Sequence, residues 1–128
     1  MPELDTAAQT PLILLVEDER ALRKVMELVL QGEGYEVVTA SNGREALVML
    51  EQVTPNLIIS DYVMPEMDGA ELVRRVRGDT RLDGIPMLLM SSAFPDNMPE
   101  RDLVDMSLAK GGSLDELLDA IASLLKLG

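Results

Sequence analysis

The sequence predicts an α/β protein built on a doubly wound sheet of five parallel strands. Short runs that are apolar throughout alternate along the chain with segments whose apolar residues recur at helical spacing. Uniformly apolar strands separated by helices are typical of a parallel sheet that is covered on both faces. A length of 128 residues suits one such domain, and no repeat or linker divides it.

Three strand–helix units are expected in the first two thirds of the chain. In each unit an apolar run is followed by a polar or glycine-containing turn and then by apolar residues every three or four positions. The elements are, in order, a strand at Leu12–Val16, a helix from Arg20 that ends near Gly32 and Gly34, a strand at Tyr35–Ala40, a helix capped by Ser41 or Asn42, a strand at Leu57–Ser60, and a helix containing Leu72, Val73 and Val76.

The last third is less regular. Residues 78–84 read as a loop, and the apolar run Pro86–Met90 predicts a fourth strand. Two prolines then leave room for only a short helix near Arg101–Asp105, so the fourth helix is expected to be atypically short. A brief fifth strand at Leu108–Lys110 and a final helix capped by Ser113 complete the pattern. We therefore expect a flexible tail at residues 1–11 and one domain at residues 12–127.

Composition excludes several classes of function. With 23 acidic and 11 basic residues the net charge is −12, which disfavours nucleic acid and anionic membrane surfaces as partners. The chain has no cysteine and no histidine, so thiol nucleophiles, cysteine-type zinc sites and Ser-His-Asp triads are impossible. No apolar stretch approaches the ~20 residues of a membrane span, and no secretory signal is visible, so a cytoplasmic location is expected.

Chemistry-bearing residues follow the predicted strands. In doubly wound sheets ligands bind beyond the carboxyl ends of the strands, where this chain has Glu17 and Asp18, then Asp61, Ser91 and Lys110. If the first and third strands are neighbours, three carboxylates meet, and a hard cation such as Mg²⁺ would relieve their repulsion. The acidic loop after the first strand argues against a phosphate cradle for nucleotides.

Each of these residues also has an ordinary structural interpretation. A single aspartate after a strand, such as Asp18, is usually a turn or helix-cap residue. Serines after a strand more often form loops than bind ligands, and a lone lysine is usually solvated. The complete set at successive strand ends is much harder to attribute to coincidence.

The motifs resemble those of the receiver domain of two-component response regulators. The resemblance rests on Leu-Leu-Val-Glu-Asp-Glu at 14–19, Asp-Tyr-Val-Met-Pro-Glu-Met-Asp-Gly at 61–69, Ser91 and Lys110, and it extends from Leu12 to Leu125. It implies a flavodoxin-like (βα)5 fold with strand order 2-1-3-4-5. It also implies a phosphoryl acceptor that receives its group from a histidine kinase, a histidine phosphotransfer protein or a small phosphodonor, since this chain has no histidine of its own.

The resemblance assigns a role to each site residue. Asp61 corresponds to the phosphorylated aspartate, and Lys110 to the lysine that pairs with the acyl phosphate. Glu17 and Asp18 correspond to the acidic pair that holds Mg²⁺, together with Asp61 and the main-chain carbonyl of Val63. The hydroxyl that turns toward the phosphoryl group corresponds to Ser91, with Ser92 as the adjacent alternative. The only catalysis implied is self-phosphorylation and slow autodephosphorylation.

The sequence departs from the family pattern in three places. All three concern the part of the domain that signals to an output partner, and none concerns the phosphorylation site. Gly111 and Gly112 follow the lysine where the family usually has proline, and Ser107 replaces a common aromatic residue. The interval from Ser91 to Lys110 is also short. These departures favour an alternative, a phosphorylation-independent scaffold that keeps the fold, whereas the complete acidic site favours a working receiver. An aspartate-nucleophile phosphatase is a third reading, but the chain has no room for its cap domain.

Overall fold

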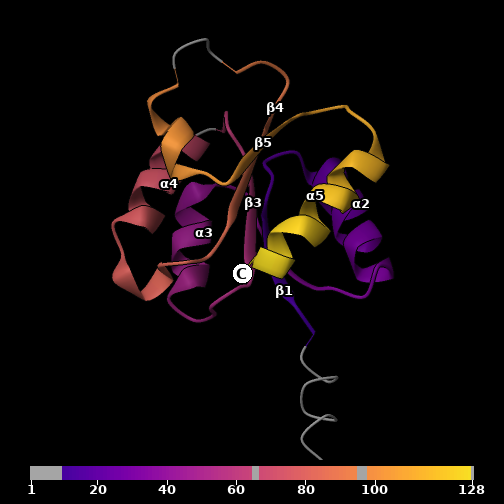
Figure 1. The fold of residues 1–128 in the computed structure, drawn as a ribbon, viewed down its shortest axis with the longest axis horizontal. Helices are drawn as coiled ribbons and strands as arrows, with labels where there is room; N and C mark the ends of the chain where they lie inside the picture. The colour runs from indigo at the N-terminus through magenta and orange to yellow at the C-terminus, as the bar shows by residue number, and fades with distance from the viewer. Residues whose placement is uncertain (1–9, 65–66, 95–97, 128) are drawn as a thin grey trace, which may run out of the picture.

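The computed structural model describes residues 10–64, 67–94 and 98–127, and these form a five-stranded parallel sheet flanked by helices (Figure 1). The strand order is β2-β1-β3-β4-β5, as expected. The strands are β1 Leu12–Val16, β2 Glu36–Ala40, β3 Leu57–Asp61, β4 Met87–Ser91 and β5 Met106–Ala109. The helices are α2 Arg20–Gly32, α3 Gly43–Leu50, α4 Gly69–Arg77 and α5 Leu114–Leu127, with 3-10 helices η1 Thr80–Leu82 and η2 Pro99–Leu103.

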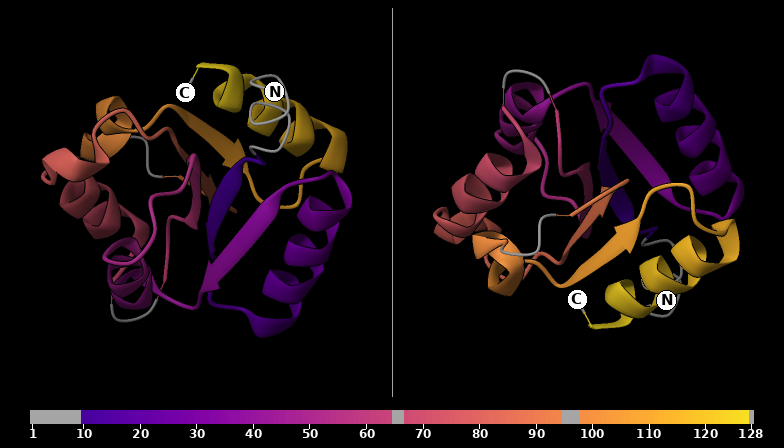
Figure 2. Two further views of the ribbon diagram at one scale, coloured as in Figure 1. Left: turned by 90° about the horizontal axis from the view of Figure 1, so that it is seen from below. Right: turned by 90° about the horizontal axis from the view of Figure 1, so that it is seen from above.

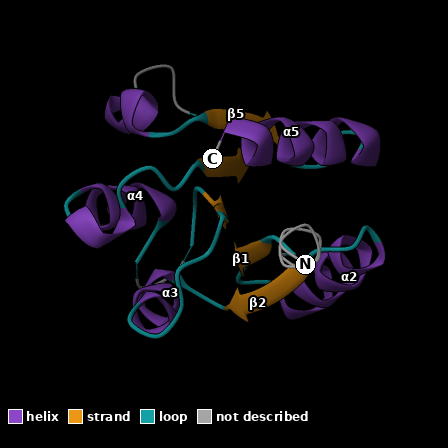
Figure 3. Cartoon of the chain, turned by 60° about the horizontal axis from the view of Figure 1, so that its bottom comes forward, coloured by secondary structure: helices purple, strands orange, loops and turns teal. Residues whose placement is uncertain are grey.

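The sheet separates two hydrophobic layers. Helices α2 and α5 cover one face and α3 and α4 cover the other (Figures 2 and 3). Successive residues of a strand point to opposite faces, so Leu14 belongs to the core beneath α3 and α4 while Ile13 belongs to the core beneath α2 and α5. Both side chains are completely buried, which explains why the strands read as uninterrupted apolar runs.

The structure shows which of the two predicted residues caps α3. Asn42, not Ser41, is the residue before the helix, and its side chain accepts a hydrogen bond from the Glu45 N–H at 2.8 Å. The Glu45 carboxylate reaches back to the Ser41 N–H at 2.8 Å. This reciprocal pair of bonds satisfies donors that would otherwise be exposed at the start of the helix.

The region after β3 departs most from the sequence prediction. The predicted short helix at Arg101–Asp105 is instead the 3-10 helix η2, two residues earlier, and the loop predicted at residues 78–84 contains the 3-10 helix η1. The fifth strand begins at Met106 rather than at Leu108. Asp105 explains the shift, because its N–H and its carboxylate both bond the backbone of Met87, at 3.0 and 2.8 Å, and so end the turn and start the pairing of β5 with β4. Strand β1 has the predicted bounds. Tyr35 and Pro86 lie just outside β2 and β4, and β3 and β4 each end one residue later than predicted.

Two arginines of α4 hold the connection between β4 and β5. Arg74 pairs with the buried carboxylate of Glu100 in η2, with 2.7 Å between Nη1 and Oε2. Arg77 donates to the carbonyl oxygens of Leu103 and Ile85, both at 2.8 Å, and its Nη2 lies 2.9 Å from Oδ1 of Asp105. We call these contacts the α4 arginine clamp. They fix a connection that has no α-helix of its own among its described residues.

The first described residues precede β1. Residues 1–9 of the predicted tail lie outside the described residues, and the Pro11 carbonyl accepts a hydrogen bond from Glu36 N–H at 3.0 Å. Within the ranges that the structure describes, no helix has both the length and the apolar character needed to cross a membrane.

Candidate functional site

The carboxyl ends of β1 and β3 bring three acidic residues together. Val16 lies opposite Ser60 in the parallel pairing, so the residues that follow, Glu17 and Asp61, are neighbours. Carboxylate oxygens of Glu17, Asp18 and Asp61 lie within 4.8 Å of one another. Glu17 and Asp61 are only 2% and 4% exposed, whereas Asp18 is exposed. One side of the cluster is therefore enclosed and the other faces solvent.

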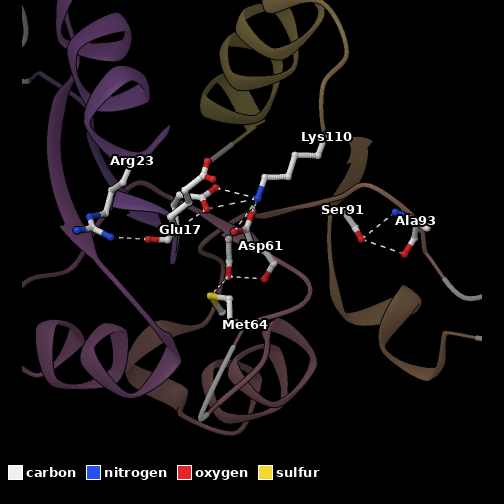
Figure 4. Close-up of polar contacts among 9 residues, drawn as sticks. Glu17, Arg23, Asp61, Met64, Ser91, Ala93 and Lys110 are labelled. Carbon is white, nitrogen blue, oxygen red and sulfur yellow. Dashed lines mark hydrogen bonds and ion pairs between the residues drawn. The ribbon is translucent and has the colours of Figure 1, made fainter. Parts of the chain in front are cut away.

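Lys110 reaches into this cluster from the end of β5. Its Nζ lies 3.0 Å from Oδ1 and Oδ2 of Asp61 and 3.1 and 3.3 Å from Oε1 and Oε2 of Glu17 (Figure 4). The Lys110 backbone N–H donates to the Ser91 carbonyl at 2.8 Å, which extends the β4–β5 pairing up to the lysine. The ammonium group thus touches two carboxylates whose residues lie 93 and 49 positions away in sequence.

The pKa of Asp61 is set by burial and by two charged neighbours, Glu17 and Lys110. Burial, and after it the neighbouring Glu17, raise the pKa of the Asp61 carboxyl, Lys110 only partly opposes them, and the net result is a pKa of about 7. Burial alone would lower the pKa of Lys110, but its hydrogen bonds to Asp61 and Glu17 outweigh burial and hold that pKa above its usual value. In the absence of a cation, the site therefore resists full ionisation of Asp61.

A glycine fixes the distance between α4 and the acidic cluster. The Gly69 N–H donates to the Tyr62 carbonyl at 2.7 Å and closes the loop after β3. A Cβ at Gly69 would collide with the carbonyl oxygen of Asp61 and would lie 2.8 Å from Cα of Tyr62. Only glycine lets the helix start this close to the strand. The backbone of Asp61 therefore lies between the start of α4 and its pairing partner in β4.

Ser91 lies near the site but turns away from it. Its hydroxyl donates to the Ala93 carbonyl at 3.0 Å and accepts from the Ala93 N–H at 3.2 Å (Figure 4). Ser92 is exposed, and the Val63 side chain is 69% exposed on the loop that follows Asp61. Of the residues predicted for the site, Glu17, Asp18, Asp61 and Lys110 are brought together, and Ser91 reaches them only if its two bonds to Ala93 break.

The sequence analysis missed two features of the site. Arg23 donates from Nη1 to the carbonyl oxygen of Glu17 at 2.8 Å, and the rings of Tyr62 and Phe94 pack with centroids 5.5 Å apart. The aromatic pair joins the loops after β3 and β4, and nothing in the local sequence signals it. The sequence did offer one indication of the arginine's role. A cation near the start of a helix is unfavourable for the helix dipole, so an arginine at this position suggests a contact outside the helix.

The donor set fits Mg²⁺. Three carboxylates that converge at one sheet edge provide hard oxygen ligands, and the exposed side at Asp18 leaves room for the waters that Mg²⁺ usually keeps. Cysteine and histidine, the ligands that softer metals prefer, are absent from the whole sequence.

Comparison with known proteins agrees with this geometry. A family model described as the response regulator receiver domain matches residues 13–122. The phosphate regulon transcriptional regulatory protein PhoB of Rhizobium meliloti is 32% identical over an alignment of 119 positions, and the match covers 91% of this chain and 52% of that protein. The chain thus spans about half the length of that regulator, and less than half of three other curated relatives.

Two solved structures are similar over nearly the whole chain. The signal receiver domain of a signal transduction histidine kinase from Syntrophus aciditrophicus has a TM-score of 0.84 and 33% identity, and the match covers 91% of each chain. The response regulator protein TrrA of Thermotoga maritima, solved in complex with Mg²⁺-BeF, has a TM-score of 0.77 and 29% identity over 90% of this chain and 99% of that one.

Proposed function

The chain belongs to the response regulator receiver domain family of two-component signalling, and from this premise we propose that residues 12–127 accept a phosphoryl group on Asp61. A histidine kinase or a histidine phosphotransfer protein is the proposed donor, since the chain has no histidine. The observation that carries the proposal is the buried Asp61 carboxylate, flanked by Glu17 and Asp18 and held on both oxygens by Lys110. The acidic composition and the absence of cysteine are consistent with a cytoplasmic protein that binds other proteins rather than nucleic acid or membrane.

The proposed reaction uses groups that the site already positions. A carboxylate oxygen of Asp61 attacks phosphorus, the bond from phosphorus to the donor's imidazole nitrogen breaks, and the imidazole leaves with the electron pair. Glu17 and Asp18 would hold Mg²⁺, together with Asp61 and the main-chain carbonyl of Val63. When bound, the cation neutralises charge on the phosphoryl oxygens. Lys110 would move its hydrogen bonds from the Asp61 carboxylate to one of those oxygens.

Ser91 would report the reaction. Its hydroxyl is engaged with Ala93 while Asp61 carries no phosphoryl group. A phosphoryl oxygen is a strong charged acceptor, and a hydrogen bond to it is stronger than a neutral one. Turning the hydroxyl to that acceptor breaks both bonds to Ala93 and frees the loop in which Phe94 packs on Tyr62. The phosphorylation state of Asp61 would thereby alter the loop after β4.

The direct test is phosphorylation of the purified chain. We expect incubation with acetyl phosphate and Mg²⁺ to add about 80 Da to the intact mass, the mass of one phosphoryl group on a carboxylate nucleophile. The same incubation in EDTA should give little or no adduct. If the chain stays unlabelled with excess donor and Mg²⁺, it does not act as a phosphoryl acceptor, and the phosphorylation-independent scaffold becomes the better candidate function.

One observation favours that second candidate, a phosphorylation-independent scaffold. The described part of the β4–β5 connection is held by the α4 arginine clamp, and Ser107 of β5 is exposed where the family commonly has an aromatic residue. A chain that is labelled on Asp61 but shows the same amide exchange in residues 91–94 before and after labelling would accept phosphate without switching. That result would favour the scaffold over a signalling receiver.

The phosphorylated state is expected to be long-lived. Hydrolysis of an acyl phosphate needs a water held in line behind phosphorus, and polar side chains near the acceptor can hold it. Val63 is two residues after Asp61 and Ala93 is two after Ser91, and neither side chain can hydrogen-bond a water. We expect the double variant Val63→Asn, Ala93→Glu to lose its phosphoryl group roughly tenfold faster than the wild type, measured after donor removal in excess Mg²⁺. Equal or slower loss from the variant would show that water positioning at these residues does not limit the rate.

A further inference from the structure

Arg23 lies behind the metal-binding loop and contacts its backbone. Its Nη1 donates to the Glu17 carbonyl at 2.8 Å, on the side of the loop away from the carboxylates (Figure 4). On the other side of the same residue, the Glu17 carboxylate accepts from the Glu19 N–H at 2.9 Å and from Lys110. The turn from β1 into α2 is thus held at both the main chain and the side chain of Glu17.

The position of Arg23 is unfavourable for its own helix. Helix α2 begins at Arg20, has no acidic residue in its first turn, and has no side-chain hydrogen bond from its cap residue Glu19. A cation at a helix N-terminus opposes the helix macrodipole. Arg23 therefore adds nothing to the start of α2 through the dipole. The one side-chain hydrogen bond that Arg23 makes in the described part of the chain leads to the loop that carries Glu17 and Asp18.

We propose that Arg23 is a positioning residue that preorganises Glu17 and Asp18 for Mg²⁺ by fixing the Glu17 carbonyl. The inference rests on the proposed metal site. Asp18 is exposed, so burial does not hold its carboxylate beside Asp61. The path of the backbone between Val16 and Glu19 therefore sets its position. An arginine that fixes the preceding carbonyl limits that path at the residue where it leaves the sheet. Partners beyond the ligands commonly change metal affinity tenfold or more when removed.

Two physical effects of removing Arg23 have opposite signs, which makes the proposal testable. Removal takes a positive charge away from a cation site, and by Coulomb's law alone this tightens Mg²⁺ binding. Removal also releases the loop, and the lost preorganisation weakens Mg²⁺ binding. The proposal requires the second effect to be the larger one.

The experiment measures Mg²⁺ affinity by isothermal titration calorimetry, with Mg²⁺ alone and no phosphodonor. We expect Arg23→Gln to bind Mg²⁺ roughly tenfold more weakly than the wild type. Arg23→Lys, which keeps the charge and a donor, should recover most of that loss. Arg20→Gln is the matched control, since Arg20 is an exposed cation of the same helix turn, and its removal should leave affinity unchanged or slightly tighter. Urea unfolding in EDTA identifies the variants that are fully folded.

Each outcome decides between the hypotheses. Weaker binding by folded Arg23→Gln with recovery in Arg23→Lys supports the positioning role. Unchanged or tighter binding by Arg23→Gln overturns it, as does equal weakening in Arg20→Gln. If Arg23→Gln is not fully folded, Arg23→Met takes its place, because it keeps the apolar stem and has no hydrogen-bond donor, and weaker binding by this folded variant supports the role while unchanged or tighter binding overturns it. Failure of the wild type to bind Mg²⁺ would instead contradict the metal site and the proposed function.

Discussion

Asp61→Asn is expected to abolish the adduct of about 80 Da that acetyl phosphate and Mg²⁺ produce on the wild-type chain. An asparagine amide is a poor nucleophile, and we do not expect either of the other two carboxylates of the cluster to replace Asp61 as the acceptor. Glu17 is engaged by Lys110 and by the Glu19 N–H, and Asp18 faces solvent, where no lysine contact activates it in the described structure. Intact mass after a saturating incubation measures the result, and we expect residual labelling below the detection limit.

Two controls make the assignment specific. Asp102→Asn removes one exposed carboxylate far from the cluster in sequence and should label as the wild type does. Asp18→Asn keeps the acceptor but removes a proposed Mg²⁺ ligand, so its labelling should need a higher Mg²⁺ concentration. Undiminished labelling of Asp61→Asn would show that another side chain is the acceptor, and full labelling of the wild type in EDTA would remove the metal from the proposal.

Without metal, the wild type should lose stability as the pH rises from 5 to 8. The pKa of Asp61 is about 7 in the folded chain, against an ordinary value of 3.8. Between those two values the folded state holds a proton that the unfolded state has released, so the free energy of unfolding falls as pH rises and levels off above pH 7. Each pH unit within that window changes it by about 1.4 kcal/mol at most. We expect a loss of about 2 kcal/mol between pH 5 and 8 that is absent from Asp61→Asn.

Urea unfolding in EDTA at several pH values measures this dependence. The comparison with Asp61→Asn isolates one carboxyl group from the general repulsion of a chain with net charge −12. We expect Asp61→Asn to be the more stable protein at pH 8 without metal. Saturating Mg²⁺ should remove most of the pH dependence from the wild type, because a bound cation favours the ionised carboxylate. Parallel pH profiles for the two proteins would mean that Asp61 is ionised throughout.

The sequence predicts what depends on local pattern and on strand order. Leu12–Val16 and Leu57–Asp61 are readable because buried parallel strands need unbroken apolar runs, and the residues after them meet because parallel strands end at one edge of the sheet. That reasoning places Glu17, Asp18 and Asp61 together only if the first and third strands are neighbours, an order that the family resemblance implied and that the structure shows. Their chemical roles came from the family resemblance and remain predictions.

The errors lie where tertiary contacts override local pattern. The fifth strand starts at Met106 because Asp105 pairs with Met87, a residue 18 positions earlier. The turn at Pro99–Leu103 is held by arginines 26 positions earlier. No periodicity or spacing in the sequence encodes these choices.

The α4 arginine clamp also orders the steps of folding. Its hydrogen bonds join residues 26 and 28 positions apart. Closing a loop of that length lowers the entropy of the chain before any stabilising contact forms. In its described residues, the connection from β4 to β5 has a five-residue 3-10 helix and no other helix of its own, which is too little to persist alone. We therefore expect this connection to become structured after α4 has packed on the sheet. Lys110 follows the connection in the chain, so we expect it to enter the acidic cluster late in folding.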